Sequence, residues 1–340
     1  MIDGRVGFAE KVNKLNKYYL GIDISKAKFN VCLNQSGKQW AGEFENNNRG
    51  FKKLKKWLEN HEVEQLHACM EATGRYGEAL TKWLYEQGHE VSVVNPQVIH
   101  HYAKTQMRRN KNDQLDARLI ARYVEKESPK LWEPTPVELE VLRALTRRLA
   151  SLQESLTAET NRLKAGSHPQ PVQESIDETM AFLKAQIAKV KAQIQDHIDQ
   201  YPELRQQQEL LASIKGIGTH TAAVILGELP PVTHFETANQ VTAYAGLTPE
   251  QLQSGQTNRQ KGLIKMGSKH LRTALFLPAL SAMIHNPILV NLAERLRERG
   301  KQKMTIVGAV MRKLLHLVYG VLKNQQPFDP YYLVNVRNTA

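Results

Sequence analysis

The chain has 340 residues, a length that suggests two or three domains rather than one small core. Hydrophobic residues make up 41% and charged residues 24%, which excludes wholesale disorder, and no stretch approaches the roughly 20 apolar residues that span a bilayer. The formal net charge of +12 predicts a polyanionic partner, while the two cysteines, Cys32 and Cys69, exclude a disulfide framework and a four-cysteine zinc site.

The first third of the chain alternates short strands with helices. Three apolar, β-rich runs with short turns between them come first, and helix–strand units follow. The order β-β-β-α-β-α-β-α predicts a mixed sheet with helices on its faces, which is the order of a ribonuclease H-like fold. We expect strands at 18–25, 28–34, 39–46, 65–72 and 89–95, and helices at 48–61, 76–88 and 113–127.

The remainder is expected to be mostly helical. After a proline-marked linker at 128–136, two ladders of aliphatic residues flank a Pro/Gly break at 166–171, and their steps of three and four predict an antiparallel helical hairpin or a dimerising coiled coil. A looped basic stretch interrupts the later helices, which are expected near 210–229, 268–285, 288–299 and 303–323. The predicted parts are a leader (1–17), an α/β domain (18–132), the helical hairpin (133–200), a helical domain (201–325) and a tail (326–340).

Four carboxylates stand at places where a sheet and a packed helix can bring them together. Asp23 interrupts an apolar strand, Glu71 ends another, and Asp113 and Asp116 share one face at the start of a helix. Oxygen ligands gathered in this way suit Mg²⁺, and a pair of such ions activates a nucleophile at a phosphodiester. Each acid also has a structural explanation, such as a helix N-cap for Asp113 or an ion pair between Glu71 and Arg75.

The segment ASIKGIGTHTAAVIL (212–226) has the pattern of a helix-hairpin-helix motif. Gly216 and Gly218 allow close backbone approach and a positive φ in the turn. The amides of the turn and of the next helix can then bind a phosphate without reading bases. An ordinary tight turn between two helices is the alternative.

Ser254 lies in a polar, glycine-containing loop that a basic run follows. A serine in such a loop could be a nucleophile toward phosphorus when a base or a metal activates it, although most loop serines are only polar.

Two windows without acidic residues concentrate the positive charge, one from Glu90 to Asp113 and one from Glu250 to Glu294. Such windows suit phosphate-facing surfaces, and a solvated basic surface is the alternative. The cations are Lys104, Arg108, Arg109 and Lys111 in the first window and Arg259, Lys261, Lys265, Lys269 and Arg272 in the second.

Taken together, these segments resemble the DEDD-type insertion-sequence transposases of the "one-ten" family, which includes a "one-one-one-one" branch and relatives that invert pilin genes. The resemblance runs from about Tyr18 to Lys323. Asn112 stands where a threonine is common, and the leader before Tyr18 is extra. The segments that carry the resemblance are GIDISKAKFNV, EATGRYGEAL, NPQVIHHYAKTQMRRNKNDQLDARLIARY, LLASIKGIGTHTAAVIL, AYAGLTPEQLQSGQ and KMGSKHLRTALF.

The resemblance implies a RuvC-like N-terminal domain and a C-terminal transposase domain. It assigns Asp23, Glu71, Asp113 and Asp116 to a Mg²⁺ site, with Mn²⁺ as a substitute, and Ser254 to the nucleophile of a phosphoserine link. It also implies donor and target DNA as partners, a structured guide (bridge) RNA, and a homodimer that forms a dimer of dimers.

We therefore expect a cytoplasmic, bacterial, nucleoid-associated DNA recombinase of an insertion sequence, with no membrane partner. A metal-dependent, structure-specific nuclease like a junction resolvase, or a DNA invertase, is the alternative. A third reading is a nucleic-acid-binding protein without catalysis, which would keep its function after Asp23→Ala.

Overall fold

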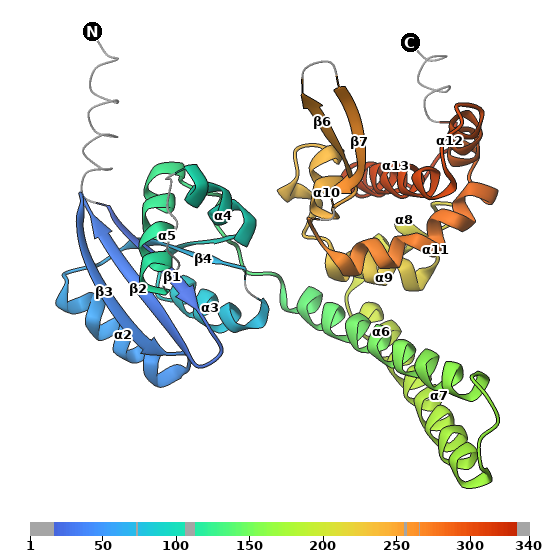
Figure 1. Ribbon diagram of the computed structural model, residues 1–340, viewed down its shortest axis with the longest axis horizontal. Helices are drawn as coiled ribbons and strands as arrows, with labels where there is room; N and C mark the ends of the chain where they lie inside the picture. The colour runs from blue at the N-terminus through green and yellow to red at the C-terminus, as the bar shows by residue number, and fades with distance from the viewer. Residues whose placement is uncertain (1–16, 73, 106–112, 255–256, 265, 332–340) are drawn as a thin grey trace. The chain divides into compact units, whose positions relative to one another are not determined.

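A computed structural model describes residues 17–72, 74–105, 113–254, 257–264 and 266–331 of the chain. Within these ranges the side chains of 75, 113–115, 250–254 and 257–261 fall outside the description. Backbone contacts divide the chain into two compact units, Met1–Pro134 and Thr135–Ala340 (Figure 1).

A five-stranded mixed sheet forms the centre of the first unit, in the order β3-β2-β1-β4-β5. The first three strands are antiparallel, and β4 and β5 run parallel to β1. The five predicted strands are confirmed, and the order is compatible with a ribonuclease H-like domain. The strands are β1 (Tyr18–Ile24), β2 (Lys28–Gln35), β3 (Lys38–Glu45), β4 (Leu66–Glu71) and β5 (Glu90–Val94).

Helices cover both faces of this sheet (Figure 1). Helices α2 (Asn48–Asn60) and α3 (Glu78–Glu86) pack on the face that holds the main apolar core, and a short 3₁₀ turn, η1 (Gly74–Gly77), precedes α3. Helices α4 (Pro96–Thr105) and α5 (Asp113–Glu127) pack on the other face.

Helix α4 was not predicted, although Ile99, Tyr102 and Ala103 stand at helical spacing and pack in one apolar cluster. Ile99 is its one buried residue. Proline at the first position of a helix is favoured, so Pro96 begins this helix as well as ending the strand before it.

Gly21 in β1 lets α5 lie unusually close to the sheet. A Cβ at this position would stand 2.1 Å from the carbonyl oxygen of Ala117 and 2.2 Å from the amide nitrogen of Ala121. Both atoms belong to the helix backbone, so only a shift of α5 could relieve the clash.

We expect Gly21→Ala to lower the free energy of unfolding of the first unit by about 3 kcal/mol or more. The four tryptophans all lie within residues 40–132, so their fluorescence during urea unfolding reports this unit alone. Gly77→Ala is the matched control, since its Cβ would meet only the flexible Met70 sulfur, at 3.3 Å, and the Ile24 side chain. Equal stability of the two variants would contradict the close packing of α5.

His67 makes the first unit sensitive to acid. Its side chain is 4% exposed, and Nε2 lies 2.8 Å from the Ser92 hydroxyl. Burial lowers the pKa of His67 from 6.5 to about 4, although the nearby Glu90 opposes the shift. The unfolded chain therefore binds a proton below pH 6.5 that the folded unit binds only near pH 4.

The free energy of unfolding of the first unit should therefore have its full value above pH 6.5. It should fall by up to about 3 kcal/mol as the pH drops from 6.5 toward 4. Urea unfolding followed by tryptophan fluorescence at pH 7 and pH 5 measures the loss. His67→Gln should flatten this part of the pH profile, and an unchanged slope in that variant would show that another group is responsible.

The second unit begins with a long antiparallel pair of helices, α6 (Val137–Lys164) and α7 (Gln170–Asp199). The predicted ladders form the seam between them, with Leu149 and Val190 among the buried residues. The pair is thus a hairpin within one chain, the first of the two predicted arrangements.

The rest of the second unit is mainly helical, with a two-stranded β-hairpin inserted. The sequence predicts a loop here, which is wrong. Both strands are almost entirely polar and lack the alternation that marks a half-buried strand, so only their backbone pairing defines them. The elements are α8 (Pro202–Ala212), α9 (Thr219–Glu228), η2 (Val232–His234), α10 (Ala238–Tyr244), β6 (Thr248–Ser254), β7 (Thr257–Ile264), α11 (Lys269–His285), α12 (Pro287–Glu298) and α13 (Lys303–Asn324).

Helix α13 is long and apolar enough to be a candidate membrane span, with 22 residues. However, 61% of its most apolar window is buried, and eleven of its residues, including Leu314 and Val318, are buried in the second unit. A core helix accounts for its composition.

Candidate functional site

Asp23 and Glu71 lie side by side at the carboxyl ends of two neighbouring strands. Ile22 of β1 is in register with Met70 of β4, and the strands are parallel, so the next residue on each strand is the carboxylate. Neighbouring strands are about 4.8 Å apart, and residues in register point to the same face. Both side chains are half-buried.

Helix α5 covers this face and runs antiparallel to β1. Ala117 and Ala121 contact Gly21 in the middle of the strand, as the close approach requires. Glu125, near the end of the helix, accepts a hydrogen bond of 2.7 Å from Asn34, which pairs with the first part of β1. The amino end of α5 is therefore directed toward the carboxyl ends of β1 and β4.

This orientation brings the second pair of predicted acids toward the first. Asp113 is the first residue of α5, and Asp116 directly precedes Ala117, which contacts β1. The Asp116 side chain is half-buried, and the Asp113 side chain lies outside the described residues. The four acids therefore come from three elements, β1, β4 and the amino end of α5, and α5 is directed toward the ends of the two strands.

The donor set fits a hard divalent cation, since every candidate ligand is a carboxylate oxygen. Among the side chains that the structure describes, no three His, Cys, Asp or Glu residues are grouped closely enough to hold a metal ion. That search does not include Asp113, the acid at the start of α5. A metal at this site would be held by carboxylate oxygens from the adjacent strands β1 and β4 and from helix α5.

Sequence reasoning missed Asn30, which pairs with Asp23 across β1 and β2. Its side chain is 5% exposed and shares the sheet face with Asp23. The signal was available in the strand KFNVCLN, where a polar residue stands within an apolar run, just as Asp23 does in its own strand.

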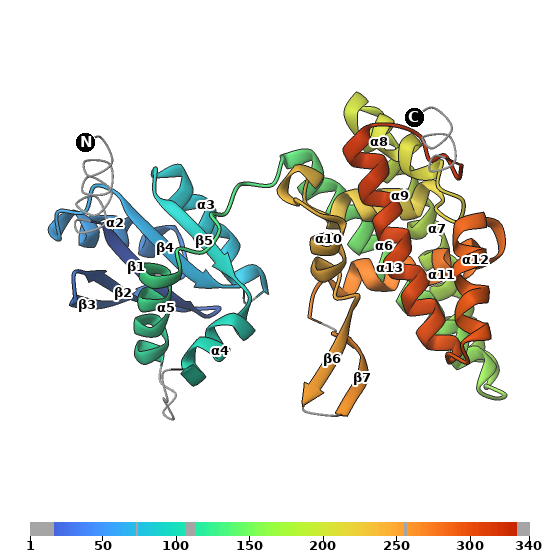
Figure 2. The same cartoon turned by 90° about the horizontal axis from the view of Figure 1, so that it is seen from above.

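Ser254 is the last residue of β6, and it pairs with Thr257 of β7. It therefore stands at the tip of a β-hairpin, which projects from the helices of the second unit (Figure 2). Six residue steps separate Thr248 from Ser254, so the strand places it about 20 Å from the base of the hairpin. The Ser254 side chain lies outside the described residues.

The helix-hairpin-helix turn differs from the prediction at one glycine. Gly216 has φ +106°, and a Cβ there would stand 2.6 Å from the Cβ of Ala282 in α11. Gly218 has φ −91° and begins α9 in open space, so the expected positive φ is wrong for this residue. The buried Asn286 side chain donates to the Lys215 carbonyl at 3.3 Å and fixes the turn.

The predicted phosphate-binding cations are distributed over both units. Lys104 is exposed in the last turn of α4, and Lys269 is exposed in the first turn of α11. Arg272 makes hydrogen bonds within the second unit, since one guanidinium nitrogen donates to the carbonyls of Ala245 and Gly267 at 2.9 and 3.3 Å. Outside the described residues lie Arg108, Arg109, Lys111 and Lys265, and the side chains of Arg259 and Lys261.

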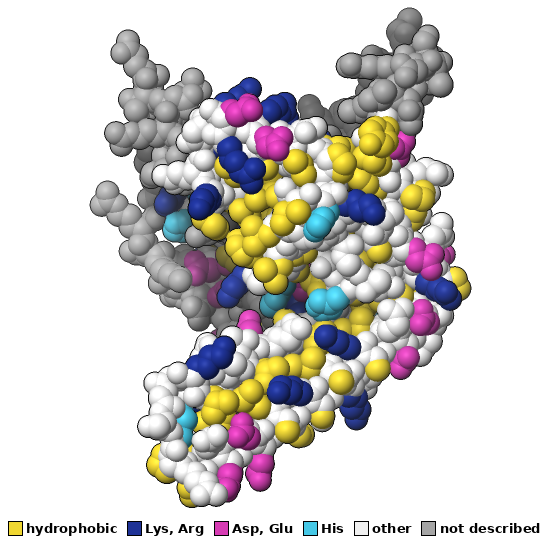
Figure 3. Space-filling view, turned by 90° about the vertical axis from the view of Figure 1, so that its right-hand side faces the viewer, with side chains coloured by type: hydrophobic (Ala, Val, Ile, Leu, Met, Phe, Trp, Pro, Cys, Tyr) yellow, Lys and Arg dark blue, Asp and Glu magenta, His cyan; other side chains and the backbone are white. Residues whose placement is uncertain are grey.

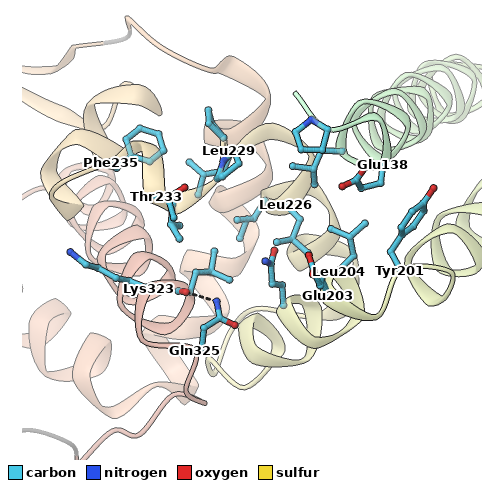
Figure 4. A pocket seen from close by; sticks show the side chains of 18 of the residues that line it. Glu138, Tyr201, Glu203, Leu204, Leu226, Leu229, Thr233, Phe235, Lys323 and Gln325 are labelled. Atoms are coloured by element: carbon cyan, nitrogen blue, oxygen red, sulfur yellow. Dashed lines mark hydrogen bonds between the residues drawn. The ribbon is translucent and has the colours of Figure 1, made fainter. Parts of the chain in front are cut away.

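A cavity of about 970 Å³ lies between the start of α6, α8, α9 and the end of α13. Figure 4 shows its mainly apolar lining, with Glu138, Glu203 and Lys323 among the few charged side chains. None of the predicted catalytic or phosphate-binding residues lines it, so the cavity does not belong to the candidate site.

Comparisons with known proteins agree with this architecture. Residues 20–166 match a family of DEDD-type transposases described as "Transposase", and residues 208–294 match "Transposase IS116/IS110/IS902 family". Pilin gene-inverting proteins from Moraxella bovis and Moraxella lacunata are each 36% identical over 319 residues, which cover 93% of this chain and 98% of those proteins. The transposase for insertion sequence element IS1111A from Coxiella burnetii is 23% identical over 78% of each chain.

The matches to transposase families in both units, together with the pilin gene-inverting relatives, show that the chain is a DNA transposase, an enzyme that cuts and rejoins DNA. The chain belongs to the IS116/IS110/IS902 family of transposases.

Proposed function

We propose that this transposase recombines DNA through a covalent phosphoserine intermediate formed by Ser254. The observation that carries the proposal is the placement of Ser254 at the tip of a projecting hairpin, where a nucleophile is able to reach a DNA backbone. Its hydroxyl oxygen attacks a phosphodiester, the O–P bond forms, and a deoxyribose oxygen leaves with a proton. Rejoining reverses this step with a different strand end and needs no nucleotide cofactor.

Asp23, Glu71, Asp113 and Asp116 are proposed to hold the divalent metal, Mg²⁺ or Mn²⁺, in the first unit. When bound, the metal stabilises the charge that develops on the phosphate. The chain's own contribution is to keep four carboxylates at one end of the sheet, with Gly21 allowing α5 to approach closely enough.

We propose donor and target DNA as the substrates, with a structured RNA as the guide that supplies sequence specificity. The exposed Lys104 and Lys269 suit contacts to phosphates, which position a nucleic acid without reading its sequence.

A homodimer that forms a dimer of dimers is proposed as the active assembly. Figure 3 shows hydrophobic side chains gathered on one face of the second unit, and α11 exposes 71% of Leu277 and 72% of Ile284.

DNA inversion is a second candidate reaction, because the two Moraxella relatives are named as pilin gene-inverting proteins. Inversion and insertion use the same cleavage and rejoining chemistry and differ only in how the DNA sites are arranged. Incubating the protein with a plasmid that carries the element's ends in inverted orientation and with a separate target plasmid, and sequencing the new junctions, distinguishes the two. Free DNA ends without any rejoined product would instead indicate a nuclease.

A further inference from the structure

The base of the β6–β7 hairpin is held by a dense set of backbone contacts. Arg272 bridges the carbonyls of Ala245, before the hairpin, and Gly267, after it. The Ser268 amide donates to the Tyr244 carbonyl at 2.9 Å, and a Cβ at Gly267 would stand 2.3 Å from that same oxygen. The chain therefore enters and leaves the hairpin at nearly one point.

A buried carboxylate lies beside this point. Glu228, at the end of α9, is 2% exposed and accepts two hydrogen bonds from the Arg147 guanidinium of α6, at 2.6 and 2.9 Å. Ser268, the N-cap of α11, donates its hydroxyl to the same carboxylate at 3.4 Å. One side chain thus links the long helical hairpin to the residue that directly follows the β-hairpin base.

The backbone around Glu228 strengthens the link. The Tyr244 hydroxyl donates to the Glu228 carbonyl at 3.2 Å, and Arg143 of α6 donates to the Gly227 carbonyl at 2.7 Å. Burial raises the pKa of Tyr244, although the nearby Arg143 opposes the shift, so this hydroxyl keeps its proton and remains a donor. Helices α6, α9, α10 and α11 therefore meet around the ion pair of the buried Glu228 with the half-buried Arg147.

We propose that Glu228, together with Arg147 and Ser268, positions the β6–β7 hairpin and thereby aims Ser254 at the DNA. This inference rests on the proposed function, in which Ser254 is the nucleophile. A two-stranded hairpin has little stability of its own, so its direction is set where it joins the helices. With the tip about 20 Å from the base, a tilt of about 10° moves Ser254 by about 3 Å.

The test compares Glu228→Gln with the unaltered protein in the presence of a DNA duplex that carries the element's end. Three quantities are measured: the rate of covalent protein–DNA adduct formation, the affinity for the same duplex, and the hydrogen exchange of the backbone amides of β6 and β7. Ser268→Ala is a milder variant in case Glu228→Gln does not fold, and Ser268→Thr is the conservative variant that keeps the hydroxyl.

The matched control is Asn286→Ala. Asn286 caps α12 as Ser268 caps α11, and it is fully buried, but its contacts are with the Lys215 carbonyl and the Ile288 amide, away from the hairpin base. Because Lys215 belongs to the predicted phosphate-binding turn, adduct rates are compared at saturating duplex, where a change in DNA affinity has no effect. Any variant that only loosens the helical unit should behave like this control.

In Glu228→Gln we expect adduct formation to slow by about 10²-fold, because a nucleophile misplaced by an ångström or more loses that much rate. DNA affinity should stay within about twofold, and the hairpin amides should exchange faster than in Asn286→Ala. Ser268→Ala should show the same changes more weakly. Ser268→Thr, which keeps the hydroxyl, should restore the normal adduct rate and hairpin exchange.

The inference is overturned if Glu228→Gln and Ser268→Ala change adduct rate and hairpin exchange no more than Asn286→Ala does. The proposed function fails separately, if the unaltered protein forms no adduct at all. In that case the hydrogen exchange of the hairpin still decides whether Glu228 positions it.

Discussion

Ser254→Ala is expected to abolish the covalent protein–DNA adduct and to lower recombination by at least about 10³-fold. Removing the hydroxyl removes the atom that attacks the phosphate, and no solvent molecule can replace it in a reaction that must conserve the bond. DNA binding should stay unchanged, because one hydroxyl at a hairpin tip contributes little to a mainly ionic interaction. A denaturing gel of the protein incubated with labelled duplex measures the adduct.

Thr257→Ala is the control for this variant, because Thr257 pairs with Ser254 on the opposite strand and also carries a hydroxyl. It should form the adduct at close to the normal rate. An adduct that persists in Ser254→Ala, or that disappears equally in both variants, would contradict the assignment of the nucleophile.

The second large effect is expected from the acids of the first unit. Asp23→Asn and Glu71→Gln should each lower the rate of DNA cleavage on the order of 10³-fold, because each removes a charged ligand of the metal. The measurement is the cleavage of a supercoiled plasmid in about 5 mM Mg²⁺, with and without a chelator.

Glu90→Gln is the matched control for the acid variants. Glu90 lies on the same sheet in β5, but it pairs with His67 at the opposite end of the strands. It should keep its cleavage activity. If Asp23→Asn and Glu71→Gln cleave as well as Glu90→Gln does, these acids do not form the metal site.

The sheet was predictable because each strand has a recognisable local sequence pattern. In β1 and β4, short apolar runs end at turn residues, and a polar Asp23 or Glu71 stands out against them. Helix α4 was overlooked although Ile99, Tyr102 and Ala103 have helical spacing, whereas the β6–β7 hairpin was not predictable, since its strands show no apolar alternation. The hairpin is defined by backbone pairing between polar strands, which leaves no mark in composition.

The residues of the candidate site were also recognisable from the sequence, whereas their arrangement in space was not. Register and helix direction, which bring Asp23, Glu71 and Asp116 to one end of the sheet, follow from pairing partners that the sequence does not specify. Arg272 has a structural role that the sequence does not indicate. The sequence predicts that it binds phosphate, and the fold also uses one of its guanidinium nitrogens to join two carbonyls at the hairpin base. A basic residue in a basic window gives no sign of which role it has.

We propose that the carboxylates of the first unit and Ser254 of the second unit act on the same phosphate. A duplex with sulfur in place of a non-bridging oxygen at the scissile phosphate tests it directly, because Mg²⁺ binds sulfur poorly and Mn²⁺ binds it better. We predict that the Ser254 adduct forms slowly on this duplex in Mg²⁺ and recovers in Mn²⁺, with no recovery in Asp23→Asn. An adduct that forms equally fast with either metal, or after the metal has been removed, would contradict the account.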